Sequence, residues 1–167
     1  MTQDEFYQHL DTLYEAGDPA EVERFLTFHV NFYKDGETFN SQLLLTAQSE
    51  LGGFYRSCGR YGEAKDHFSQ ALALCAQNKG KDSMAYATTL YNLGSCCRLL
   101  QETEQAEHCF TEARESFEAH EATDNYLYAC ILNELALLYM DTGRAEDGIE
   151  LLSKATELLD AFRAMQN

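Results

Sequence analysis

The chain has 167 residues, which is enough for one domain and too short for two ordinary ones. Its 28 acidic residues outnumber 12 Lys and Arg, so the formal charge is −16, while 45% of the residues are hydrophobic. That much apolar material indicates a folded chain. The acidity argues against nucleic acid as a main partner, because phosphate binding needs a basic patch, and against docking on an anionic membrane surface.

The sequence begins with MTQDEFYQHL, which is acidic and lacks the basic region and apolar run of a secretory leader. No stretch approaches the roughly 20 apolar residues of a membrane span. We therefore expect a cytoplasmic protein, with its six Cys reduced and buried. Because the sequence has no C-x-x-C pair, we expect no metal site.

The first forty residues have apolar side chains at helical spacing in two runs, which are Phe6, Leu10, Leu13 and Tyr14, then Val22, Phe25, Leu26 and Val30. Between the runs, Gly17 can end a helix. Asp18 and Pro19 then supply an N-cap followed by Pro at the first helical position. This pattern predicts a helical hairpin over residues 1–40.

The rest of the chain repeats itself at an offset of 42 residues. The small and large apolar positions that coincide are Leu51, Leu93 and Leu135; Gly52, Gly94 and Ala136; Ala64, Ala106 and Gly148; Phe68, Phe110 and Leu152; and Ala71, Ala113 and Ala155. Apolar residues recur at three- and four-residue steps within each copy, with polar breaks at 59–60, 101–103 and 143–144. We predict hairpins over 41–82, 83–124 and 125–167, starting near Ser41, Ser83 and Asp124, with 1–40 as a degenerate N-terminal unit. The whole would have about eight helices.

The repeat resembles the tetratricopeptide repeat family. The resembling residues are Leu51-Gly52, Tyr55, Gly59, Ala64, Phe68 and Ala71 in one copy, with their counterparts 42 and 84 residues later. The usual period is about 34 residues. The longer period, and the string from Thr88 to Gly94, are similar to the repeats of kinesin light chains. Cys97, Gln101 and Gly148 depart from the family pattern. The resemblance implies a single all-α domain over 1–167, a right-handed superhelical solenoid of helical hairpins.

The resemblance also implies that the first helix of each hairpin lines a concave peptide-binding groove. The groove residues would be Thr46, Ser49, Glu50, Gly53 and Arg56; Thr88, Tyr91, Asn92, Ser95 and Arg98; and Asn133, Glu134, Leu137 and Met140. Asn92 would hold the backbone of an extended peptide, or would be a solvated helix residue. Arg56 and Arg98 would bind a ligand carboxylate, or would pair with neighbouring acids. Gly53 would leave a shallow pocket, or would be a weak point in the helix.

We therefore expect a protein-binding scaffold or adaptor that holds an extended peptide or a partner helix. The alternative is a small acidic chaperone for a secreted or aggregation-prone client, similar to the tetratricopeptide chaperones of bacterial secretion systems. No catalytic motif or cofactor motif is found, so we expect no enzyme activity and no cofactor. The acidic run 102–124 is either a solubilising outer surface or a docking patch for a basic partner.

The last predicted helix is apolar, with Ile149, Leu151, Leu152, Leu158, Leu159, Phe162 and Met165. Solenoids usually need a polar cap at each end. We therefore expect this helix to self-associate or to be followed by more protein in a longer parent chain; it could also fold back on its own repeat.

Overall fold

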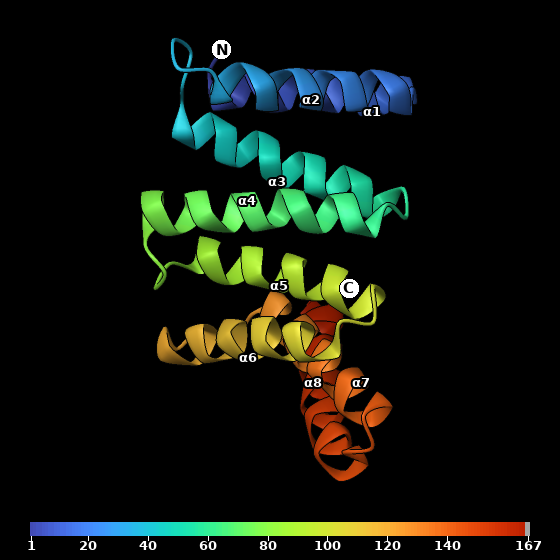
Figure 1. Cartoon of the computed structure of the whole chain (residues 1–167). Helices are drawn as coiled ribbons and strands as arrows, with labels where there is room; N and C mark the ends of the chain where they lie inside the picture. Colours follow the sequence, from blue (N-terminus) through green and yellow to red (C-terminus); the bar gives the residue numbers. More distant parts are fainter. Residues whose placement is uncertain (166–167) are drawn as a thin grey trace. The chain divides into compact units, whose positions relative to one another are not determined.

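The computed structural model describes residues 1–165, and within them the chain forms eight α-helices and no strand (Figure 1). The helices are α1 (Gln3–Ala16), α2 (Pro19–Lys34), α3 (Ser41–Ser57), α4 (Tyr61–Lys79), α5 (Met84–Leu99), α6 (Thr103–Ala119), α7 (Tyr126–Asp141) and α8 (Ala145–Met165). They follow one another as helical hairpins, so the predicted all-α fold is confirmed.

The chain divides into two compact units, Met1–Asn78 and Lys79–Asn167, which we call the N-unit and the C-unit. The N-unit contains the hairpins α1–α2 and α3–α4, and α2 packs against both α1 and α3. The C-unit contains α5–α6 and α7–α8, and α6 packs against both α5 and α7. The single-domain organisation with four repeats stays a prediction.

The helices begin at residues that can satisfy free backbone N–H groups. Asp18 accepts hydrogen bonds from the backbone of Ala20 and Glu21, with Pro19 at the first helical position, as predicted. The start predicted near Asp124 is wrong. Helix α7 begins at Tyr126 instead, because Asn125 is the side chain that caps it by accepting from the Leu127 N–H at 2.8 Å.

The turns inside the hairpins use left-handed backbone. Gly59 and Gly143, two offsets apart, have φ of 75° and 80°, a conformation that Gly adopts without a Cβ clash. Gln101 takes the same place in the intervening hairpin and is also left-handed, with φ of 62°. The middle turn therefore keeps its shape despite lacking the usual Gly, at a cost of about 1 kcal/mol.

The two helices of each hairpin approach closely where a small residue faces a larger one. A Cβ on Gly52 would lie 3.0 Å from the ring of Phe68, and one on Gly94 would lie 2.9 Å from the ring of Phe110. Both rings are buried. In the last hairpin the small residue lies on the second helix, where a Cβ on Gly148 would lie 2.9 Å from the backbone oxygen of Ala136. The aligned small residues thus allow the two helices of a hairpin to pack closely.

The N-unit also buries polar side chains. Gln48 is 1% exposed. Its Nε2 donates to Oε1 of Gln70 at 3.0 Å, and its Oε1 lies 2.5 Å from Nδ1 of His67. His29 is buried among aromatic rings, with Nδ1 2.8 Å from the backbone oxygen of Phe25. Burial lowers the pKa of both imidazoles, so their neutral forms are favoured in the folded state.

The expectation that all six Cys are buried is wrong in part. All six lie among the described residues and are reduced; Cys75, Cys96, Cys97 and Cys109 are buried, Cys130 is half-buried and Cys58 is exposed. Cys58 differs because it is the C-cap of α3, where the chain turns at the surface. Among the described residues, no helix is both long enough and apolar enough to cross a membrane.

Two neighbouring glycines test the close packing. Gly53→Ala should raise the free energy of unfolding by about 1 kcal/mol, because a Cβ there meets no atom and Ala favours the helix. Gly52→Ala should lower it, because the new Cβ would press on the Phe68 ring. Urea denaturation of both variants measures the difference. Equal effects at the two positions would contradict the packing described for α3 and α4.

The lowered pKa of buried His29 and half-buried His67 predicts a pH dependence of stability. The unfolded chain takes up protons near a pKa of about 6.5, before the folded chain does. The stabilising contribution of His29 and His67 is therefore complete above that pH and is lost as the pH falls. Urea midpoints should decrease from pH 7.5 to 5.5, and less steeply in His29→Phe, whose ring fits the same aromatic surroundings. His108→Gln serves as the control, because the His108 side chain is 76% exposed. An unchanged slope in His29→Phe would show that His29 does not titrate with folding.

Candidate functional site

The first helices of the two N-unit hairpins face each other in register. Gln3 of α1 donates to Oγ1 of Thr46 on α3 at 3.4 Å. One turn further along each helix, the charge of the Glu50 carboxylate acts on the Tyr7 hydroxyl. Asp11 also acts electrostatically on Glu50. We call this surface the N-unit inner face. It comprises Tyr7, Asp11 and Tyr14 of α1, and Thr46, Glu50, Gly53 and Ser57 of α3.

Glu50 is the central charged group of the N-unit inner face. Burial raises the pKa of its carboxyl, and the charge of Asp11 raises it further, while the nearby Tyr7 hydroxyl opposes the shift. Burial also raises the pKa of Tyr7 and Tyr14, and the Glu50 charge adds to both shifts. Among the described residues neither Glu50 nor Asp11 forms an ion pair. The face therefore holds carboxylates that no cation of the N-unit neutralises.

The five α3 residues predicted for the groove differ in exposure. Thr46 is 5% exposed and its hydroxyl donates to the backbone of Gln42, so it presents little surface. Ser49 and Glu50 are half-buried. Gly53 faces open space, since a Cβ there would meet no atom within 4 Å.

Arg56 lies over the Phe68 ring, with its guanidinium carbon 5.9 Å from the ring centroid. It is thus directed toward α4.

An apolar pocket of about 200 Å³ lies at one end of the N-unit inner face. It is formed where the α1–α2 turn meets the end of α3. Leu13, Val22 and Phe54 supply apolar walls, and Tyr14 and Cys58 are exposed at its edge. We call this the N-unit pocket. Its lining and size suit an aliphatic side chain.

Sequence reasoning missed Tyr7, Asp11 and Tyr14, although a signal was present. The 42-residue offset places them at the positions of Ser49, Gly53 and Arg56, which were all assigned to the groove. Because the sequence predicts a degenerate first hairpin, its first helix carries no predicted groove residues. Two partly exposed Tyr, 37% for Tyr7 and 47% for Tyr14, follow that register along α1.

In the C-unit, an ion pair connects the two first helices. Arg98 of α5 donates from Nε to Glu134 of α7 at 2.5 Å, with 27% and 17% of the two side chains exposed. Of the two predicted roles for Arg98, pairing with an acid is the one that the structure supports. Sequence alone did not identify Glu134 as the partner, because the two residues are 36 positions apart.

The remaining α5 residues predicted for the groove are mixed in exposure. Thr88 is exposed and Asn92 is half-buried. The Tyr91 ring lies 6.1 Å from that of Phe110, and Ser95 is buried with its hydroxyl donating to the Tyr91 backbone.

On α7, Asn133 and Leu137 are half-buried. Met140 is 43% exposed, but its side chain lies over Gly148 of α8. We call Thr88, Asn92, Asn133 and Leu137 the C-unit inner face. Which of these residues bind a ligand stays a prediction.

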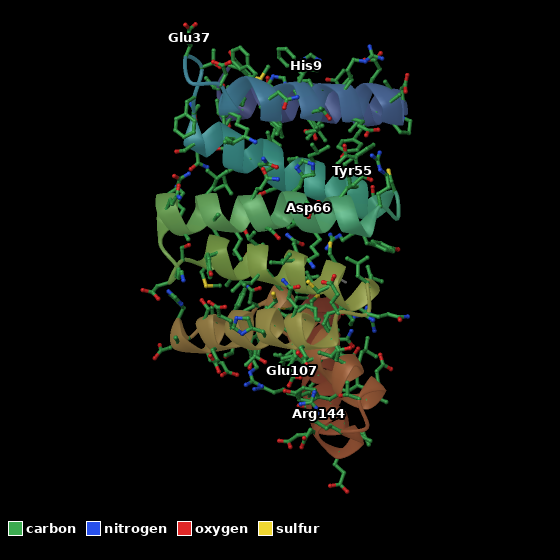
Figure 2. The ribbon with its side chains drawn as sticks, viewed as in Figure 1. His9, Glu37, Tyr55, Asp66, Glu107 and Arg144 are labelled. Atoms are coloured by element: carbon green, nitrogen blue, oxygen red, sulfur yellow. The ribbon has the colours of Figure 1, made fainter. Side chains whose placement is uncertain are left out.

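Part of the acidic run 102–124 is used within the C-unit. Arg144 donates to both carboxylate oxygens of Glu107, at 2.7 and 2.8 Å, and its guanidinium lies 3.9 Å from the centroid of the Tyr139 ring (Figure 2). Glu118 accepts from the Tyr128 hydroxyl at 2.9 Å. These acids have a structural role, so the run is not wholly available to a partner.

The N-unit repeats this arrangement two offsets earlier. Arg60 donates to Glu23 at 2.7 Å and lies 4.1 Å from the centroid of the Tyr55 ring. Cys97 and Glu102 occupy the Tyr and Arg positions of the intervening repeat, which therefore lacks the motif. Among the described residues no group of three or more His, Cys, Asp or Glu could hold a metal ion.

Comparison with solved structures finds the same fold in several other proteins. BtubC (BKLC) from P. vanneervenii is 22% identical with a TM-score of 0.79, over 93% of this chain and 61% of that one. The apo form of RapI is 15% identical with a TM-score of 0.80, over 95% and 56%. A Rap protein complexed with competence and sporulation factor is 18% identical with a TM-score of 0.69, over 93% and 43%. The chain thus spans about three fifths or less of each of these proteins, and the likeness shows the fold alone.

A comparison with curated proteins finds no significant match. Two family models, both described as tetratricopeptide repeat, match residues 43–119 and 131–158. The first match runs from α3 to the end of α6 and the second from α7 into α8. Together with the hairpin geometry, these matches show that the chain belongs to the tetratricopeptide repeat family.

Proposed function

We propose that the protein is an interaction module that binds an extended peptide, or a partner helix, on the inner faces of its units. The observation that carries this proposal is the N-unit inner face. Two partly exposed tyrosines surround a half-buried Glu50 and lead to an apolar pocket. Tyrosine supplies a large contact area at low entropic cost, which suits a binding surface.

The family match and one structural neighbour support the same proposal. Tetratricopeptide hairpins stack into surfaces that typically bind proteins. One solved structure of similar fold is a Rap protein complexed with competence and sporulation factor. On the C-unit inner face, Asn92 is half-buried, and an amide side chain is the type that recognises a peptide backbone, because it carries both a donor and an acceptor.

Selection from a phage-displayed library of random 15-residue peptides tests the proposal. The most enriched peptides, made synthetically with a fluorophore, should bind the purified protein in fluorescence anisotropy. Asn92→Ala should weaken peptides that occupy the C-unit inner face by about tenfold, the effect of losing one or two hydrogen bonds. Asn31→Ala is the matched control, because Asn31 is an exposed residue on the second helix of its hairpin. Its melting temperature and that of Asn92→Ala are measured first.

Two outcomes would contradict this function. One is a library that yields no peptide with saturable binding. The other is a set of peptides whose affinity responds to Asn31→Ala and to no residue of either inner face. Truncation of each peptide then separates an adaptor from a chaperone. An adaptor binds a short core of the peptide, whereas a chaperone needs the full unfolded length.

A further inference from the structure

The N-unit pocket and the carboxylates beside it define a ligand more narrowly than the fold does. We propose that this pocket receives an aliphatic side chain of a bound peptide, while Glu50 and Asp11 receive a basic side chain two residues away in the same peptide. This inference rests on the proposed function. It names a ligand class, an apolar residue and a basic residue separated by one position.

The preference for an aliphatic side chain follows from the N-unit pocket. Leu13, Val22 and Phe54 give it apolar walls, and its volume is about 200 Å³. An apolar cavity of about 150 Å³ is enough to hold a benzene molecule. The N-unit pocket therefore has room for a Leu, Ile or Met side chain.

The preference for a basic side chain follows from the charges along the N-unit inner face. Glu50 precedes Phe54 by one helical turn on α3, and Asp11 precedes Tyr14 by nearly one turn on α1. Neither carboxylate forms an ion pair among residues 1–165. Tyr7 and Tyr14 flank Glu50 and can present ring faces, which attract cations. A Lys or Arg side chain would pair with the carboxylates and pack against the rings.

The separation of the two sites sets the spacing in the peptide. Four residues of α-helix advance about 6 Å, from Glu50 to Phe54. An extended peptide advances about 3.3 Å per residue. Two peptide residues therefore cover one helical turn, and their side chains point to the same side. This gives the predicted alternation of one apolar and one basic residue.

The charge of the N-unit decides what kind of chain occupies the site. Residues 1–78 contain twelve acids and five Lys and Arg, a net charge of −7. Such a field attracts basic peptides and repels acidic ones. A second copy of this chain, at −16, is a poor occupant on the same ground. The occupant is therefore a basic segment of a different protein.

Peptides enriched from the random library test this inference through sequence and affinity. Those that Asn92→Ala does not weaken should share an aliphatic and a basic residue separated by one position. Glu50→Gln should weaken them by about tenfold, because it removes a charge-assisted hydrogen bond. Asp66→Asn should leave affinity within about twofold, since an exposed charge away from the contact adds little. Asp66 is an exposed acid on α4, in the same unit and outside the inner face, so the variant makes the same change in charge (Figure 2).

A thiol at the edge of the pocket gives an independent readout. Cys58 is exposed and lines the N-unit pocket. A bound peptide should slow the reaction of Cys58 with a maleimide. In a Ser69→Cys variant, the new thiol on the exposed side of α4 should react at the same rate with and without peptide. Mass spectrometry of proteolytic fragments measures both rates in one molecule.

Each outcome decides between the two proposals. Shared apolar–basic spacing, Cys58 protection and a loss of affinity in Glu50→Gln support the ligand class. If none of the enriched peptides protects Cys58, or none is weakened by Glu50→Gln, the ligand class is overturned and the interaction module stands. A library that yields no binding peptide overturns both.

Discussion

The fold depends on the close approach of the two helices in each hairpin. In the α3–α4 and α5–α6 hairpins the small residue is Gly52 or Gly94, and a buried Phe ring of the second helix occupies the space that a side chain would take. This contact fixes the rotation of the first helix about its own axis. The rotation in turn determines which residues turn away from the partner helix, such as Glu50 in α3 and Thr88 in α5. The binding surface is therefore a consequence of packing on the opposite side of the same helices.

The acidity of the chain has two physical meanings in the structure. Glu23 pairs with Arg60, and Glu107 pairs with Arg144; both guanidinium groups also lie on Tyr rings. Each of these acids therefore connects its own hairpin with the next one. Glu50 is different, because burial raises its pKa and no cation among the described residues pairs with it. A charge that is partly desolvated without a partner costs stability. A basic ligand would offset that cost, which connects the electrostatics of the N-unit with its proposed function.

The repeat could be predicted from the sequence because small and aromatic residues recur at a fixed offset. Close helix packing requires those residue types at those positions. Local exceptions to the repeat pattern could not be predicted in the same way. Gln101 adopts a left-handed turn without Gly, and Asn125 caps α7 one residue beyond the predicted start. Cys58 lies at the surface because a helix ends there, which composition cannot reveal. The pairing of Arg98 with Glu134 depends on which helices are neighbours, and so needs the tertiary structure.

The central claim is that the first helix of each hairpin binds the peptide and the second helix supports the first. Photo-crosslinking tests it most directly, with an enriched peptide that carries a benzophenone in place of one residue at a time. Mass spectrometry then locates each crosslink on the chain. We predict crosslinks to α1 and α3, or to α5 and α7, within the inner faces defined above. Crosslinks confined to α2, α4, α6 and α8 would contradict the claim, whatever the affinity of the peptide.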